Sequence, residues 1–295
     1  MKVFVTGAQG QVGQCLTRLL DDKKLSYQAF SREQLDITDW QAVENAIMHY
    51  QPDIIINAAA YTSVDKAESE QDLAYRVNCD GAAHLARAAE KHKSLFLHIS
   101  TDYVFSGLQE GTYSENDETS PLSVYGSSKL AGEKKVHELC STAITLRTSW
   151  VFSEFGNNFV KTMIKLGQTR DTLNIVGDQF GGPTYAGDIA KTLLEIAEQY
   201  TENTNFEQFG IYHFSGFPYV SWSEFAEYIF NVAKQEDVIE KTPQITSIKT
   251  EEYPVAATRP KNSKLSMTKI KNKLGLCPSH WQEALKDIKH YRVNP

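Results

Sequence analysis

Cysteine is scarce in this chain of 295 residues. The four that are present lie far apart and form no C-x-x-C pair: Cys15, Cys79, Cys140 and Cys277. Cysteine-based zinc sites and disulfide frameworks use characteristic cysteine spacings, so isolated reduced thiols fit this pattern better. We therefore expect no metal site and no disulfide.

Long apolar runs are also absent. A membrane-spanning helix needs about 18 or more apolar residues, whereas the longest candidate, Ile54–Ala60, is interrupted by Asn57. The chain enters a strand and a glycine turn directly after Met1, which leaves no space for the apolar core of a signal peptide. We expect a cytoplasmic protein without a membrane span.

Positive charge is in the minority. Thirty-seven acidic residues against 30 Lys and Arg give a formal net charge of −7, and no basic block suited to nucleic acid stands out. We therefore expect no nucleic-acid partner. The remaining composition, 41% hydrophobic and 23% charged, is that of a globular protein with one large domain or a domain and a lobe.

Short apolar runs alternate with segments in which apolar residues recur at helical intervals. Strands are predicted at Lys2–Thr6, Tyr27–Phe30, Asp53–Asn57, Leu95–Ser100 and Ala143–Arg147. This alternation is typical of a parallel sheet covered by helices on both faces. The sequence therefore predicts an α/β fold with a Rossmann-type, doubly wound parallel sheet.

The alternation weakens after Trp150. Helices are predicted near Asn158–Leu166 and Ile189–Gln199, a glycine-rich turn at Gly177–Pro183, a strand near Gly210–Phe214, and a loop or lobe periphery over Gln235–Val255. We predict a dinucleotide-binding domain over residues 1–150. Residues 151–295 would form a smaller, mainly substrate-binding α/β lobe, with some chain returning to the first domain.

Three glycines, Gly7, Gly10 and Gly13, separate the first strand from the first helix. Gly7 would allow the tight turn, Gly10 the close approach of a pyrophosphate, and Gly13 the packing of the helix on the sheet. A plain strand-to-helix turn also uses glycine. The position at the first strand–helix junction of a repeating α/β chain favours a dinucleotide site.

The end of the second strand carries Ser31 and Arg32, where a site specific for NAD would offer a carboxylate. A hydroxyl and a guanidinium suit a 2′-phosphate, so we expect NADPH, with NADH possible. The alternative is that Arg32 is a solvated surface charge. Asp36 and Ile37 are candidates for the adenine edge, and Ala58–Ala60 offers small side chains beside the cofactor.

Tyr125 and Lys129 stand four residues apart, a spacing that a helix places on one face. A free tyrosine titrates near about 10, and a neighbouring ammonium would lower the pKa of the phenol. Such a pair often occurs on helices without a function. Thr101, just after a predicted strand, supports a catalytic interpretation because its hydroxyl could polarise a carbonyl beside Tyr125.

The glycine triplet, Thr101, Tyr125 and Lys129, in this order, resemble an extended short-chain dehydrogenase/reductase. Further segments are similar to the motifs of the dTDP-4-dehydrorhamnose reductase family: Ala59–Glu68, Ser100–Phe105, Arg147–Phe152, Gly156–Phe159, Gly182–Thr184 and Ala257–Pro260. The resemblance covers the whole chain, from residue 1 to about 290.

This resemblance implies NADPH-dependent reduction of the C4 ketone of dTDP-4-dehydro-6-deoxy-L-mannose to dTDP-L-rhamnose. Tyr125 would donate a proton to the developing alkoxide and Thr101 would hydrogen-bond to that oxygen. Lys129 would hold the nicotinamide ribose and tune Tyr125.

The resemblance also implies further binding residues. Additional cofactor contacts would be Gln11, Val12, Tyr61 and Thr62. The residues lining the sugar-nucleotide pocket would be Thr62, Val64, Thr101, Asp102, Tyr103, Tyr125 and Trp150. Candidates for the diphosphate are Asn158, Lys161 and Arg259, and Arg259 is equally a candidate for a structural ion pair.

Two features limit the transfer from the family. Some members carry a glutamate after the last loop glycine that serves a magnesium-bridged dimer; here Gly13–Leu16 has none, so we predict no such metal site and leave monomer or homodimer open. Arg32 favours NADPH in a family that often uses either cofactor.

Three rival functions follow from the same motifs. A sugar-nucleotide 4,6-dehydratase would need an acid where Tyr103 stands, which argues against it. No residue of this kind separates a C4 epimerase from a reductase, so an epimerase is the main alternative enzyme. A non-catalytic regulatory subunit, like that of methionine adenosyltransferase, is a third alternative, although intact Thr101, Tyr125 and Lys129 favour an enzyme.

Overall fold

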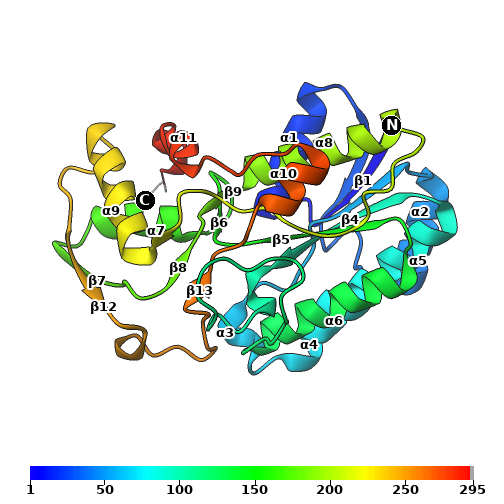
Figure 1. Ribbon diagram of the computed structural model, residues 1–295. Coiled ribbons are helices and arrows are strands. Elements are labelled where there is room, and N and C mark those ends of the chain that lie inside the picture. Colours follow the sequence, from blue (N-terminus) through cyan, green and yellow to red (C-terminus); the bar gives the residue numbers. More distant parts are fainter. Residues whose placement is uncertain (293–295) are drawn as a thin grey trace.

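A six-stranded parallel sheet organises the computed structural model, which describes residues 1–292 (Figure 1). Its strand order is β10-β5-β4-β3-β1-β2. The strands are β1 (Lys2–Thr6), β2 (Ser26–Phe30), β3 (Ile54–Asn57), β4 (Leu95–Thr101), β5 (Ala143–Thr148) and β10 (Gly210–His213). The predicted α/β fold with a parallel Rossmann-type sheet is confirmed. β2 is added on one side of β1, and β3 and the later strands are added on the other side. Parallel sheets bind ligands at such a point, beyond the carboxyl ends of the strands.

Both faces of this sheet are buried, because alternate strand residues point to opposite sides. Val3 and Val5 pack on one side, against α1 (Gln11–Asp22) and α8 (Ala186–Glu202). Phe4 packs on the other side, in the core that includes residues of three more helices. Those helices are α2 (Trp40–Tyr50), α5 (Ala82–His92) and α6 (Val124–Leu139).

The start of α6 is fixed by side chains on both sides of the first turn. The Ser123 hydroxyl accepts a hydrogen bond from the amide of Gly126, and a Glu68 carboxylate oxygen accepts one from the amide of Val124 at 2.9 Å. Such caps satisfy amides that have no partner within the helix. They fix the first turn, which carries Tyr125.

A chain of short helical segments links β3 to α5: α3 (Val64–Ala67), α4 (Gln71–Tyr75) and the π-helical turn η1 (Arg76–Gly81). The turn buries Asn78, whose side chain accepts a hydrogen bond from the amide of Tyr61 and donates to its carbonyl oxygen. The same amide group donates to the Ser128 hydroxyl of α6 at 3.0 Å. Asn78 thus ties the loop after β3 to the helix that carries Tyr125 and Lys129.

Most residues after β5 build a second, smaller core beside the sheet. It is formed mainly by α7 (Phe159–Gly167) and α9 (Trp222–Gln235), with contributions from α11 (Trp281–Leu285) and η4 (Ile288–Tyr291). Three small sheets surround it. Their strands are β6 (Val151–Phe152) with β9 (Thr184–Tyr185); β7 (Thr172–Val176) with β12 (Gln244–Ile248); and β8 (Phe180–Gly181) with β11 (Val220–Ser221) and β13 (Asn262–Ser263).

The C-terminal half also contributes to the main sheet. β10 pairs with β5, and α8 and α10 (Thr268–Leu274) supply residues to the core that covers this region. Two short 3-10 helices, η2 (Asp102–Val104) and η3 (Thr250–Glu252), complete the secondary structure described. Within residues 1–292, no helix is long and apolar enough to cross a bilayer.

One prediction for this half is wrong. The segment Gln235–Val255 was expected to be loop or periphery, but its residues 244–248 form β12, which pairs in parallel with β7. No residue of this strand is fully buried, and its sequence has no apolar run that would indicate a strand.

Candidate active site

A cleft of about 790 Å³ opens at the carboxyl ends of the sheet strands. It brings together most residues that the sequence singled out. On the cofactor side these are Gly7, Gly10, Gln11, Val12, Ser31, Arg32, Asp36, Ile37, Ala58, Ala59, Ala60, Tyr61 and Thr62. The remaining predicted residues that line it are Val64, Thr101, Asp102, Tyr103, Tyr125, Lys129 and Trp150.

The glycine loop is shaped by contacts that exclude side chains. Gly7 has a φ of +75°, and a Cβ there would lie 2.5 Å from the carbonyl carbon of Ala58. A Cβ on Gly13 would lie 2.1 Å from the carbonyl oxygen of Gly7. A Cβ on Gly10 would meet only that same oxygen, at 3.3 Å, so the glycine faces open space at the start of α1. The loop therefore fits a pyrophosphate at the helix N-terminus.

The loop after β2 carries Ser31 and Arg32, which were predicted to favour NADPH, and Asp36, which was predicted to meet the adenine edge. Ser31 is buried and Arg32 is exposed at the cleft wall. The amide of Thr38 donates a hydrogen bond to Asp36 at 2.9 Å. This bond, with the nearby charges of Arg32 and Arg76, lowers the pKa of Asp36. Asp36 and Arg32 therefore both line the cleft beside β2.

The three predicted catalytic residues converge at the other end. Thr101 is the last residue of β4, and Tyr125 and Lys129 lie one turn apart on α6. Lys129 is buried, and its Nζ donates a hydrogen bond to the carbonyl oxygen of Ile99 at 2.7 Å. The carbonyl of the neighbouring strand residue thus fixes the position of the ammonium beside the cleft.

The expected effect of Lys129 on Tyr125 is not found. Burial raises the pKa of Tyr125, and a hydrogen bond with Thr101 offsets this only in part. Burial also lowers the pKa of Lys129, to about 8, against the opposing influence of Glu133. Desolvation is the largest influence on each group, and it disfavours both the phenolate of Tyr125 and the ammonium of Lys129.

Asp102 and Tyr103 follow Thr101 in η2. Asp102 is buried and accepts a hydrogen bond from the Thr101 hydroxyl at 3.0 Å, while burial raises the pKa of its carboxyl to about 6. Tyr103 presents its ring edge-on to Tyr125, with centroids 5.4 Å apart. Burial raises the pKa of Tyr103 to about 12, so its phenol stays protonated at neutral pH.

Trp150 stands where β5 ends, in the left-handed backbone region with a φ of +48°. Its ring stacks on Trp222 of α9, with centroids 3.5 Å apart and planes 9° from parallel. The stack joins the cleft wall to the second core, so Trp150 both lines the cleft and contacts the lobe.

Four predicted residues do not line the cleft. Gly13 packs beneath the glycine loop. Asn158 caps α7 and donates to Gln11 Oε1 at 2.9 Å and to two backbone carbonyls, and Lys161 donates to the carbonyl oxygen of Glu154. Both side chains are thus held by neighbouring groups outside the cleft lining. Arg259 does not line the cleft itself but donates a hydrogen bond to Tyr103, which does.

Several lining residues were not anticipated as parts of the site. They are Gln9, Leu35, Ser63, Val77, Ile99, Ser100, Thr148, Ser149, Val151, Gly156 and Asn157. Thr148 and Ser149 carried a usable signal, because they stand at the carboxyl end of a predicted strand. Val77 carried none, since its spacing is that of a helix core.

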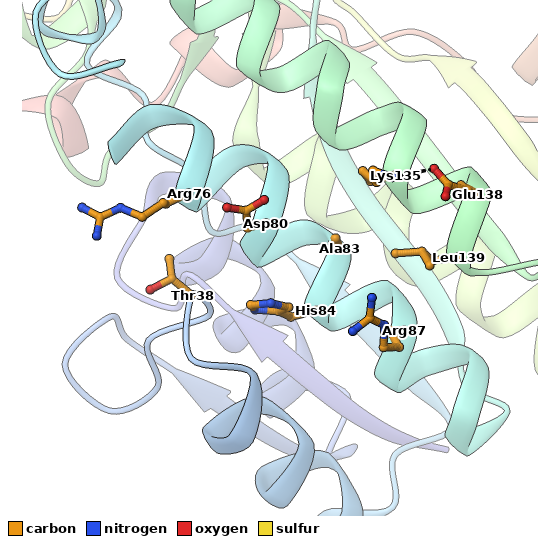
Figure 2. A pocket seen from close by; sticks show the side chains of 9 residues that line it. All are labelled: Thr38, Arg76, Asp80, Ala83, His84, Arg87, Lys135, Glu138 and Leu139. Carbon is orange, nitrogen blue, oxygen red and sulfur yellow. Dashed lines mark hydrogen bonds and ion pairs between the residues drawn. The ribbon is translucent and has the colours of Figure 1, made fainter. Parts of the chain in front are cut away.

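A second hollow, of about 440 Å³, lies away from these residues, between α5 and α6 (Figure 2). Its walls are mostly charged, and Lys135 pairs with Glu138 of the same helix at 2.8 Å. His84 binds the carbonyl of Ile37 through Nδ1, which connects this hollow to the loop beside the main cleft. Among residues 1–292, no group of three or more His, Cys, Asp or Glu is placed to hold a metal ion.

Comparison with known proteins agrees with this geometry. The model of the family described as "RmlD substrate binding domain" matches residues 1–292. The dTDP-4-dehydrorhamnose reductase of Aggregatibacter actinomycetemcomitans is 49% identical over 291 residues, which cover 98% of this chain and 99% of that protein.

Two crystal structures are closely similar. The dTDP-4-dehydrorhamnose reductase of Bacillus anthracis in complex with NADP has 37% identity and a TM-score of 0.89, with 97% of each chain covered. The ortholog from Clostridium acetobutylicum has the same identity and TM-score, with 97% of this chain and 98% of that chain covered. This chain therefore belongs to the dTDP-4-dehydrorhamnose reductase family.

Proposed function

We propose that this protein uses NADPH to reduce the C4 ketone of dTDP-4-dehydro-6-deoxy-L-mannose, giving dTDP-L-rhamnose for polysaccharide synthesis. The observation that carries the proposal is the convergence of Thr101, Tyr125 and Lys129 in the same cleft as the glycine loop. The names of the relatives, and the NADP bound to the Bacillus anthracis enzyme, support the choice of substrate and cofactor. NADH is a possible second cofactor.

The cofactor side of the cleft is proposed to act as follows. When bound, NADPH would supply the hydride that the ketone carbon accepts. Gly7, Gly10 and Gly13, with the amides at the start of α1 and neighbouring Gln11 and Val12, would receive the pyrophosphate. Ser31 and Arg32 would hold the 2′-phosphate, and Asp36 and Ile37 the adenine. Ala58–Thr62 would pass close to the ribose and nicotinamide.

Tyr125 is the proposed proton donor. Its raised pKa keeps the phenol protonated at neutral pH, which is the form that an acid must have before the reaction. The Thr101 hydroxyl, which donates to Asp102 in this structure, would turn to donate to the same substrate oxygen and stabilise the negative charge that develops there. Lys129, whose Nζ is held by the carbonyl oxygen of Ile99, would bind the nicotinamide ribose.

The sugar nucleotide is proposed to occupy the part of the cleft between the sheet and the lobe. Thr62, Val64, Asp102, Tyr103 and Trp150 would line it. Of the three diphosphate candidates we favour Arg259, because it contacts Tyr103 of the cleft lining, whereas Asn158 and Lys161 bind Gln11 and backbone carbonyls. Arg259 also forms an ion pair with Asp65, which is the structural role considered from the sequence.

We further propose the division into a cofactor domain over residues 1–150 and a substrate lobe over 151–295, of which 293–295 lie outside the described residues. β10, α8 and α10 would be the parts that return to the first domain. We propose a cytoplasmic monomer or homodimer without metal. Size-exclusion chromatography with light scattering would distinguish the two oligomeric states.

The direct test is a steady-state assay with the keto sugar nucleotide and NADPH, followed by the loss of nicotinamide absorbance. A reductase consumes one NADPH for each sugar reduced. A C4 epimerase would convert a sugar without net consumption of NADPH, and a binding subunit would convert none. Either of those results would contradict the proposal.

A further inference from the structure

The segment from Lys249 to Lys261 connects β12 of the lobe to β13, and on the way it reaches α3 of the first domain (Figure 1). Residues 251–256 are all exposed, whereas Ala257 is only 1% exposed. Thr258 is exposed again and Arg259 is half-buried. Ala257 and Arg259 both form hydrogen bonds with one residue of α3, Asp65.

Asp65 holds this segment with both carboxylate oxygens. Its Oδ1 accepts a hydrogen bond from the backbone amide of Ala257 at 3.1 Å, and its Oδ2 accepts one from Nη2 of Arg259 at 2.6 Å. The two oxygens therefore fix the backbone and the side chain of the segment at once. Asp65 adjoins Val64, which lines the cleft.

Arg259 connects Asp65 to a residue of the cleft wall, Tyr103. Its Nη1 donates to the phenol oxygen of Tyr103 at 3.3 Å, and the Tyr103 ring stands edge-on to Tyr125. A guanidinium has five N–H groups, so these two bonds leave three donors for a ligand. A planar guanidinium with free donors is well suited to phosphate oxygens.

The ion pair between Asp65 and Arg259 is too exposed to contribute much to folding stability. The side chain of Asp65 is 45% exposed and that of Arg259 is 22% exposed. Pairs as exposed as this contribute little to stability, because water screens them. The pair does fix the direction of the long Arg259 side chain. A side chain that is already ordered before the ligand binds loses less entropy on binding, so affinity is higher.

We propose that Asp65 is a positioning residue, which holds Arg259 against Tyr103 of the cleft wall so that the free donors of Arg259 meet the diphosphate of the nucleotide sugar. The proposal rests on the proposed function for the identity of that ligand. The opposite arrangement is that Asp65 competes with the diphosphate for Arg259. The two arrangements predict opposite changes in affinity when the Asp65 charge is removed.

The test compares Asp65→Asn with Asp72→Asn, a matched loss of one exposed carboxylate from the neighbouring helix α4. Affinity for dTDP is measured by calorimetry, and KM and kcat with the keto sugar nucleotide. We expect Asp65→Asn to raise the dTDP Kd and the sugar KM about tenfold with kcat changed little, since the contact is made equally in ground and transition states. The NADPH Kd should not change, and Asp72→Asn should resemble the wild type.

A second measurement needs neither substrate nor activity. Hydrogen exchange at the Ala257 amide should accelerate in Asp65→Asn, because its acceptor is weakened and the segment is released. Arg259→Gln should weaken dTDP binding as much as the double variant does, since Asp65 acts through Arg259. Fully additive losses in the double variant, or unchanged exchange at Ala257, would contradict the proposal.

The outcomes also separate this proposal from the proposed function. A wild-type protein that binds dTDP more tightly than Asp65→Asn, yet reduces no keto sugar, would contradict the reductase assignment and support the role of Asp65. A wild-type protein that reduces the sugar, with Asp65→Asn showing an equal or lower KM, would contradict the role of Asp65 alone. Absence of dTDP binding by the wild type would contradict both.

Discussion

The ring of Tyr103 stands edge-on to the ring of Tyr125, with centroids 5.4 Å apart and planes inclined by 76°. Edge-to-face pairs of this kind are favourable, and here the contact helps to enclose the phenol that is the proposed acid. Enclosure raises the pKa of Tyr125, because the phenolate loses its water. The proton that the reaction needs is therefore present throughout the neutral range.

The first prediction concerns this proton. Tyr125→Phe should lower turnover by roughly 100-fold or more, because only the transition state uses the missing donor. NADPH affinity, measured by fluorescence, should stay within a few-fold of the wild type. Turnover close to the wild type would exclude Tyr125 as the acid.

The second prediction concerns cofactor choice. If Arg32 pairs with the 2′-phosphate, Arg32→Ala should weaken NADPH binding by about 1–3 kcal/mol, the usual contribution of a charge-assisted hydrogen bond. NADH lacks that phosphate and should bind almost as before. Equal weakening of both cofactors in calorimetry would mean that Arg32 supports the loop and does not recognise the phosphate.

The third prediction is a pH dependence that belongs to Lys129. Its pKa of about 8 lies below the ordinary value, so the folded protein loses this proton as pH rises through 8. The ammonium that would bind the ribose is then lost, and kcat/KM for NADPH should fall above about pH 8. The same shift makes the Lys129 contribution to folding stability rise with pH from about 8 to the unfolded value near 10.4, since the unfolded chain binds the extra proton there.

Lys129→Met is the control for that profile. The variant should bind NADPH more weakly, and its Kd should not change between neutral pH and pH values above 8. An alkaline loss of affinity that persists in Lys129→Met would assign the titration to another group.

The fourth prediction concerns the scaffold under the site. Arg147 of β5 donates three hydrogen bonds to Glu133 of α6, and both side chains are at most 3% exposed. Glu133→Gln would leave the guanidinium buried without a counter-charge and should cost about 3–5 kcal/mol of unfolding free energy in urea. Glu138→Gln on the same helix breaks an exposed pair with Lys135 and should cost no more than about 1 kcal/mol. Equal costs would show that burial of the first pair has no special effect.

The sequence predicted the first half of the fold closely because burial there follows a simple pattern. The predicted bounds of the five strands up to β5 agree with the structure within one residue at each end. Four of these strands are runs of mostly buried residues, whereas β2 is partly exposed and was indicated by its place between two helical segments. β12 was missed because it is partly exposed and its apolar residues are only Ile245 and Ile248.

The site was predictable where short motifs carry it and was not where the chain meets itself over long distances. Glycines, Thr101, Tyr125 and Lys129 could be read from local spacing. The contact between Asp65 and Arg259 joins residues 194 positions apart, and no local pattern indicates it. The raised pKa of Tyr125 likewise depends on burial in three dimensions, so the lowered pKa predicted from its spacing to Lys129 was wrong.

The most direct test of the central claim is a single reaction with NADPH deuterated at the transferred position of its nicotinamide. After incubation with dTDP-4-dehydro-6-deoxy-L-mannose, NMR of the sugar product should show deuterium at C4, with one NADPH oxidised for each molecule formed. A product without deuterium at C4, or no oxidation of NADPH at all, would contradict the assignment of this protein as a C4 ketone reductase.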